Sequence, residues 1–197
     1  MNRSTALSTL QRTDGEVADD TAAIDLQPDD IDTIDTLAQA YVNRSVDFIL
    51  LERVEDSVAA ATAAIDLEPD DIDTLAQAYV NRSIALSTLG RVEEALADDT
   101  AAIDLQPDDI DILAAAYVSR SVDFILLERV EEAVADVTAA IDLQPDDIDT
   151  LAQAHVNRSI ALSTLGRTDE AVADLRIVLG LLPPTHELNR QALALLA

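Results

Sequence analysis

Several residue types that would mark other kinds of protein are absent or scarce in this 197-residue chain. It contains no cysteine, which excludes a disulfide framework, a thiolate nucleophile and a cysteine-based zinc site. Aromatic residues make up only 3% of the chain, although 49% of it is hydrophobic. The core must therefore consist mostly of Ala, Leu, Ile and Val, which suits closely packed helices better than a sheet sandwich.

Positive charge is also scarce. Twelve basic residues, all of them arginine, stand against 39 acids, so the formal net charge is −27. Because phosphates would be repelled by such a chain, we expect no nucleic-acid partner. The many aspartates and the absence of lysine fit two explanations, a high-salt habitat or a genome rich in G and C.

Long apolar runs and export signals are missing as well. No uninterrupted apolar run approaches the roughly 18 to 20 residues that a membrane span needs. The N-terminus lacks a charged region followed by an apolar stretch. We therefore expect a cytoplasmic protein with no membrane partner, and the absence of cysteine is consistent with a reducing cytosol.

What the chain has in abundance is internal repetition. The marker prolines are separated by 41, 38, 38 and 38 residues, and they are Pro28, Pro69, Pro107, Pro145 and Pro183. A fixed period predicts a stacked array of one structural unit. The longer first interval contains an inserted "IDT" in "PDDIDTIDTLAQAYVNRS", which we expect in a loop or at a frayed helix start. Two kinds of unit alternate, which indicates that a pair of units was duplicated.

Each unit predicts two helices. The string "IDTLAQAYVNRSIALSTLG" follows the N-cap candidate Asp71, contains Asp73 in its first turn and continues to Gly90. This segment is helix A. The string "EEALADDTAAIDLQ" places apolar residues at helical spacing until Pro107 stops it, and this segment is helix B. The chain is therefore predicted to be a row of antiparallel helix pairs.

The string "AYVNRSIALSTLGRVEEALADDTAAIDLQP" at residues 78–107 resembles the tetratricopeptide repeat, whose bacterial versions commonly contain A-Y-x-N-R-G, L-G-R-x-E-E-A and A-I-x-L-x-P. The resemblance spans nearly the whole chain and implies an all-α, right-handed superhelical solenoid of antiparallel helix pairs. The family unit has about 34 residues, so this unit is about one helical turn longer. We expect the extra turn at the start of helix A, in "IDTL".

These observations predict a single solenoid over residues 1–197. Its predicted parts are a partial repeat 1 (1–29), repeat 2 (30–70), repeat 3 (71–108), repeat 4 (109–146), repeat 5 (147–184) and a C-terminal capping helix (185–197). A cap is expected because a solenoid must cover its last apolar face. The first half of helix A is missing before Asn2, so the chain is either a piece of a longer array or docks its bare end on a neighbour.

Helical geometry assigns the residues of "YVNRS" (79–83) to different faces. At about 100° per residue, Tyr79, Ser83, Leu86 and Gly90 share one stripe, which we expect in the core. Asn81 lies on the opposite side of the helix. Residues near it there are Gln77, Val80, Ile84 and Thr88.

The resemblance implies that this second stripe lines a concave groove, where some family members hold the backbone of an extended peptide with a series of asparagines. An amide suits this role because it both donates to and accepts from a peptide bond. The candidate groove residues are Asn43, Asn81, Asn157, Gln77, Val80, Ile84, Thr88, Val122 and Leu126. The expected partner is a protein or peptide that is partly apolar and carries basic residues for the acidic rims. The alternative is that asparagine is merely tolerated on an exposed face and was copied by duplication.

Arginine recurs as regularly, in the NRS-type triplets. These copies are Arg3, Arg44, Arg82, Arg120 and Arg158. They border the core stripe, where we predict structural ion pairs such as that of Arg82 with Asp98 or Asp99. The alternative is that they bind the carboxylate of a ligand.

No catalytic set emerges from the sequence. His155 and His186 are isolated and have no nucleophile at a plausible spacing. The string "DLQPDDID" lacks the glycine turn and the final glutamate of a calcium hand. We therefore expect no enzymatic activity, no cofactor and no metal, and interpret the chain as an interaction scaffold. The alternative is a self-associating structural solenoid, a homo-oligomer formed through exposed terminal repeats.

Overall fold

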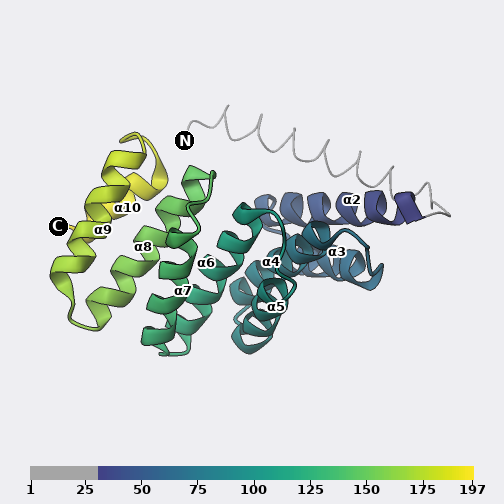
Figure 1. Cartoon of the computed structure of the whole chain (residues 1–197), viewed down its shortest axis with the longest axis horizontal. Coiled ribbons are helices and arrows are strands. Elements are labelled where there is room, and N and C mark those ends of the chain that lie inside the picture. The colour runs from purple at the N-terminus through teal and green to yellow at the C-terminus, as the bar shows by residue number, and fades with distance from the viewer. Residues whose placement is uncertain (1–30) are drawn as a thin grey trace. The chain divides into compact units, whose positions relative to one another are not determined.

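The computed structural model describes residues 31–197, and within this range the chain is helical and has no strand (Figure 1). This confirms the all-α prediction. The helices are α2 (Ile31–Leu50), α3 (Val54–Asp66), α4 (Ile72–Thr88), α5 (Val92–Asp104), α6 (Ile110–Leu126), α7 (Val130–Asp142), α8 (Ile148–Thr164), α9 (Thr168–Leu181) and α10 (Glu187–Leu195). None of these described helices is long and apolar enough to cross a membrane.

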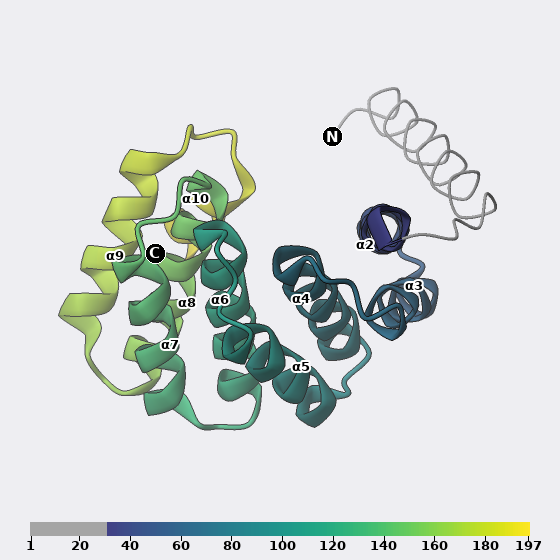
Figure 2. The same cartoon turned by 45° about the vertical axis from the view of Figure 1, so that its right-hand side comes forward.

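The chain divides after Gln106 into two compact units. Helices α2, α4, α6 and α8 are copies of helix A, and α3, α5, α7 and α9 are copies of helix B. In the first unit, α2 packs against α3 and α4 against α5, while α4 also contacts both α2 and α3 (Figures 1 and 2). In the second unit, α6/α7 and α8/α9 form the corresponding pairs, and α10 packs against α9 and α8. The described residues of each unit thus form two stacked helix pairs, to which α10 is added in the second unit.

Aspartate side chains cap the start of helix A. The carboxylate of Asp71 accepts from the backbone N–H of Thr74 at 3.2 Å, and that of Asp147 accepts from the N–H of Thr150 at 3.1 Å. The predicted N-cap at Asp71 is therefore confirmed. The hydrogen bond from the Thr150 hydroxyl is the main reason why the pKa of Asp147 lies below its ordinary value.

The "IDT" insertion lengthens a helix instead of a loop. Helix α2 has 20 residues, whereas α4 and α8 have 17 each. The first turn of α4 is the string "IDTL", as expected for the turn that distinguishes this unit from the family repeat. Both additions extend helix A at its start.

The turn from helix A to helix B uses a residue in the left-handed conformation. After α4, Gly90 has φ +75°, and the next amide, that of Arg91, donates to the Leu86 carbonyl at 2.9 Å. This is the Schellman arrangement that ends many helices. After α6, the same position is Glu128 with φ +60°. A non-glycine residue is strained in this region. The units with glutamate at this position are therefore locally less stable than those with glycine.

Small side chains build the core, as the composition predicts. In the second unit, Val156 on α8 packs with Leu175 and Val178 on α9, and all three are nearly inaccessible to solvent. In the first unit, Val42 on α2 packs with Ala78 on α4. Alanine lets helices approach closely, and this close approach decides the geometry of the candidate site.

The predicted core stripe of α4 is buried in its middle. Ser83 and Leu86 have exposures of 0% and 3%. Tyr79 is half-buried and Gly90, beyond the helix end, is exposed. Only the middle of the stripe, at Ser83 and Leu86, is therefore part of the core.

Candidate functional site

The asparagine of helix A connects successive copies of helix A within a unit. In the first unit, the amide nitrogen of Asn81 on α4 donates to the Val42 carbonyl at 3.3 Å and to the Ser45 hydroxyl at 2.9 Å, both on α2. The amide oxygen of Asn81 accepts from Gln77 at 2.8 Å. The residue is only 4% exposed. Both ends of this amide are therefore engaged inside the unit.

The second unit repeats the arrangement with longer donor bonds. Asn157 on α8 donates to the Val118 carbonyl at 3.5 Å and to the Ser121 hydroxyl at 3.3 Å, both on α6. Its oxygen accepts from Gln153 at 2.7 Å, and the residue is again 4% exposed. The same residue types at the same spacing thus form the same contact in both units.

These contacts correct the expectation that Asn81 and Asn157 present their amides to an open groove. Val80, which is 1% exposed, is also buried and cannot line such a groove. The physical reason is that the small residues between α2 and α4 let the two helices approach until the amide reaches the next backbone. Asn43, by contrast, is exposed, and its oxygen accepts from Gln39 at 3.0 Å.

Other predicted groove residues remain accessible. Ile84 is 40% exposed, and Val122 and Leu126 are 37% and 55% exposed. Thr88 is exposed and Gln77 is half-buried. We call the accessible side of helix A in each unit the helix-A face. It consists of Asn43, Val46, Leu50, Ile84 and Thr88 in the first unit, and of Val122, Leu126 and Thr164 in the second.

A pocket of about 440 Å³ lies between α2 and α4, next to Asn43. The residues that line it are all polar except Ala40, and they are Asp35, Thr36, Gln39, Ala40, Asn43, Asp71 and Thr74. The carboxylate of Asp35 accepts from the backbone N–H of Asp71 at 3.4 Å, and the Thr74 hydroxyl donates to Gln39 at 3.1 Å. The sequence did not lead us to predict Asp35 or Thr74 as site residues. Asp35 could have been predicted, because it precedes Gln39 and Asn43 at steps of four residues and so lies on the same helix face.

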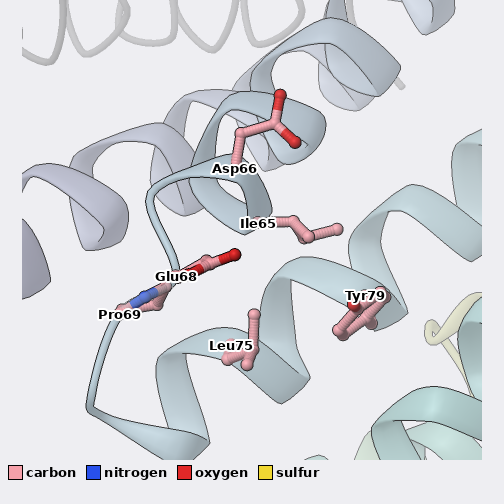
Figure 3. A pocket seen from close by; sticks show the side chains of 6 residues that line it. All are labelled: Ile65, Asp66, Glu68, Pro69, Leu75 and Tyr79. Atoms are coloured by element: carbon pink, nitrogen blue, oxygen red, sulfur yellow. The ribbon is translucent and has the colours of Figure 1, made fainter.

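A second pocket, of about 380 Å³, lies between the end of α3 and the start of α4. Figure 3 shows Ile65 and Leu75 pointing toward the space between the two helices, with Tyr79 further along α4. The carboxylate of Asp66 points away from Leu75. This pocket is lined by different residues from the helix-A face, and the sequence did not predict it.

Helix A and helix B of one pair are joined by a two-point ion pair. Arg82 donates from Nε to Asp98 at 2.7 Å and from a terminal nitrogen to the other oxygen at 2.7 Å. The two side chains are only 21% and 10% exposed. Hydrogen bonding to Asp98 raises the pKa of Arg82 above its ordinary value, against the opposing effect of burial. The predicted structural ion pair is therefore confirmed, with Asp98 as the partner.

The histidines are not isolated, contrary to the expectation from sequence. His155 replaces the tyrosine of other units, and its Nδ1 lies 2.8 Å from the carboxylate of Asp174, which also pairs with Arg158. Burial raises the pKa of Asp174, but the hydrogen bonds from Arg158 and His155 lower it by more than burial raises it. The pKa of Asp174 therefore lies below its ordinary value. His186 Nε2 lies 3.2 Å from Asp149.

The described residues contain no cluster of three or more His, Asp or Glu side chains able to hold a metal ion. The buried amides and the ion pairs of the described residues connect neighbouring helices.

Comparison with known proteins agrees with this geometry. Residues 76–109 match the tetratricopeptide repeat family model. The solved structure of TTC0263, a thermophilic TPR protein in Thermus thermophilus, is 20% identical, with a TM-score of 0.68 over 96% of this chain and 93% of that chain. BtubC from P. vanneervenii is 13% identical, with a TM-score of 0.69 over 92% and 75%. YrrB, described as a TPR protein with an unusual peptide-binding site, is 17% identical, with a TM-score of 0.59 over 95% and 87%.

No curated protein matches the sequence. The stacked helix pairs define a helical-repeat protein, a class whose extended surfaces serve as scaffolds for other proteins. Within that class, residues 76–109 match the tetratricopeptide-repeat family model, and the described helices share their fold with solved TPR proteins.

Proposed function

We propose that the chain is a non-catalytic scaffold that binds an extended peptide or partner segment along the helix-A face. One observation carries the proposal. The 440 Å³ pocket between α2 and α4 ends at Asn43, and the exposed apolar residues of the same helices begin one turn later. A polar pocket followed by Val46, Leu50 and Ile84 suits a segment that alternates polar and apolar side chains.

The chemistry of the pocket favours a basic residue. Asp35 and Asp71 contribute two carboxylates, and no Lys or Arg lines the pocket. Asn43 lies beside them and offers an amide to a peptide backbone. The net charge of −27 attracts a basic segment over a longer distance and speeds its association at low salt.

The test starts from peptides selected by display on the full chain. Their affinities are then measured by fluorescence anisotropy on wild type and on Leu50→Asp and Ile84→Asp. We expect each variant to weaken binding by at least about tenfold, because a buried apolar contact becomes a buried charge. Ile72→Asp is the matched control, since Ile72 is 49% exposed on the same helix α4 but twelve residues from Ile84, about 120° away around the helix.

Two results would overturn this proposal. One is equal binding by wild type and both helix-A face variants, and the other is an equal loss of binding in Ile72→Asp. The selected peptides should also be enriched in Lys or Arg, and binding should weaken as salt increases.

Self-association is a second candidate function, favoured by the C-terminal helices. Ile177, Leu193 and Leu195 are 43%, 51% and 48% exposed on α9 and α10. Residues 175–197 contain two arginines and one glutamate, so this end lacks the acidity of the rest of the chain. An apolar and locally basic surface suits an acidic partner, including another copy of this chain. Light scattering over a concentration series tests it, and a constant monomer mass contradicts it.

A further inference from the structure

The pocket of about 380 Å³ between α3 and α4 combines apolar walls with two carboxylates, and it is open to solvent. None of the described residues that line it is basic, and they are Ile65, Asp66, Glu68, Pro69, Leu75 and Tyr79. Glu68 and Asp66 are exposed, so a ligand reaches the pocket from outside. Its volume lies at the lower end of the range for ligand pockets, which suits a single large side chain or a small molecule.

The apolar walls come from both helices. Ile65 on α3 and Leu75 on α4 are half-buried, and both point toward the space between the helices (Figure 3). Tyr79, further along α4, is also half-buried. Because these side chains still expose part of their apolar surface, a ligand with aliphatic carbons gains free energy by covering them.

Glu68 directs a negative charge at this apolar space. It is the left-handed residue that follows α3, with φ +48°, and its backbone N–H donates to the Ile65 carbonyl at 3.0 Å. Figure 3 shows the Glu68 carboxylate directed toward the space between Ile65 and Leu75. The fixed end of the helix therefore holds the carboxylate next to the apolar walls.

Asp66 contributes less to the pocket. Its carboxylate points away from Leu75 (Figure 3). The hydrogen bond with Asp98 is the main reason why the pKa of Arg82 is raised, and the charge of Asp66 adds a smaller contribution. The charge of Asp66 thus acts on a base of the same unit. Glu68 is therefore the carboxylate that a ligand in the pocket meets.

The charge of Glu68 distinguishes this repeat from the two that follow. Gln106 and Gln144 occupy the same position, and each has φ +53°. The same turn thus forms with a neutral amide of the same length. The structure of the turn does not require a carboxylate at position 68.

We propose that this pocket binds a basic side chain of a partner protein. The aliphatic stem of such a side chain covers Ile65 and Leu75, while its charged end reaches Glu68. A helical-repeat protein offers its extended surface to other proteins, and the net charge of −27 attracts basic ones. The pocket shares no residue with the helix-A face, so its test succeeds or fails independently of the proposed function.

The probe is the tripeptide Gly-Arg-Gly with both ends blocked. Its neutral counterpart contains citrulline, which has the same length as arginine and no charge. The full chain, labelled with ¹³C in its isoleucine methyl groups, is titrated and followed by nuclear magnetic resonance, and Ile65→Val assigns the Ile65 signal. We expect this signal to shift and to saturate with a Kd on the order of 1 to 10 mM, since so small a ligand binds weakly.

Glu68→Gln removes the charge and keeps the side-chain length, and glutamine already occupies this position in the later repeats. This variant should bind the arginine peptide about three- to fivefold more weakly, the range expected for a partly exposed ion pair. The citrulline peptide should bind wild type and Glu68→Gln equally, because it has no charge for the carboxylate to attract.

Glu55→Gln is the matched control. Glu55 is exposed in the first turn of α3, ten residues before Ile65. The variant loses the same charge about 15 Å away along the helix, beyond the screening length of about 8 Å at physiological salt. Its affinity for the arginine peptide should equal that of wild type.

Three results overturn the proposal. They are an Ile65 signal that shows no saturable shift, equal affinity of wild type and Glu68→Gln for the arginine peptide, and an equal loss of affinity in Glu55→Gln. Butylguanidinium, which has the side chain without the peptide, distinguishes the source of the cation. Tighter binding of butylguanidinium than of the peptide would assign the pocket to small free cations and contradict a partner side chain, whereas equal or weaker binding supports one.

Discussion

Replacing Asn81 by alanine tests the finding that this residue links α4 to α2. The change removes two bonds between helices, to the Val42 carbonyl at 3.3 Å and to the Ser45 hydroxyl at 2.9 Å. It also removes the bond from Gln77 within α4, which the control Asn43→Ala matches by losing its bond from Gln39. The Val42 carbonyl keeps its bond from the Ser45 hydroxyl at 2.6 Å, so the backbone acceptor of α2 is not left without a partner, and the Ser45 hydroxyl loses a donor but still donates. The variant should therefore lose only the net free energy of these hydrogen bonds and the small amount that a cavity costs.

These terms set the expected magnitude. Two hydrogen bonds contribute roughly 1 kcal/mol each, and alanine regains roughly 0.5 kcal/mol of helix propensity relative to asparagine. We expect Asn81→Ala to lower the free energy of unfolding by about 1.5 kcal/mol. Asn157→Ala should cost less, because its donor bonds are longer, at 3.5 and 3.3 Å.

The matched control is Asn43→Ala. Asn43 occupies the same position of helix A but is exposed, and among the described residues none accepts from its amide nitrogen. The control shares the gain in helix propensity and loses no link between helices, so it should be neutral or slightly stabilising. The difference between the two variants isolates the contribution of the link.

Urea unfolding followed by far-UV circular dichroism measures this difference from the midpoints and slopes. If Asn81→Ala and Asn43→Ala have the same stability within about 0.5 kcal/mol, the link does not stabilise the unit and the reasoning fails. A loss of peptide binding in Asn81→Ala with unchanged stability would support the expectation of an open groove.

Three further predictions concern the turns and ion pairs. Glu128→Gly should raise stability by roughly 0.5 to 1 kcal/mol in thermal melts, because glycine adopts a φ of +60° without strain, and Gly166→Glu should lower it. Arg82→Met should cost roughly 2 to 3 kcal/mol in urea, because Asp98 loses two charged donors at a site that is 10% exposed. The pKa of Asp174 lies below its ordinary value of 3.8. The ionised carboxylate of Asp174 therefore contributes to folding stability above pH 3.8, and this contribution is lost as the pH falls below it. The stability difference between wild type and Asp174→Asn should therefore shrink as pH falls below 3.8.

Each of these predictions has a contradicting result. A lower melting temperature for Glu128→Gly would show that the left-handed turn is not strained. Unchanged stability of Arg82→Met would show that the ion pair is only a geometric contact. A stability difference for Asp174→Asn that stays constant at all pH values would contradict the lowered pKa.

Much of the fold follows from local sequence rules. The proline intervals predict the repeat, and Asp71 predicts the helix start, which the structure confirms. The position of Arg82 beside the core stripe predicts an ion pair with Asp98 or Asp99, and the structure shows the pair with Asp98. These features depend on contacts within one helix or between the two helices of one hairpin. Because the partners lie close in sequence, the hairpin of the two helices brings them near each other.

The contact between His155 and Asp174 was not predicted, although its two residues are only nineteen positions apart. Histidine replaces tyrosine there, and a helical wheel identifies the shared face without showing which polar atoms come into reach. The choice depends on how α8 lies against α9. A sequence pattern contains no distance between helix axes.

The direction in which Asn81 points follows from the sequence, since helical geometry places it away from the core stripe of its own helix pair. Whether that direction leads to solvent or to another helix was decided only by tertiary structure. Small residues such as Ala78 let α4 approach α2 until the amide meets the Val42 backbone. The same asparagine at position 43 is exposed. Helical periodicity therefore determined which residues share a face, and the packing of one helix on the next determined which of those faces stayed open.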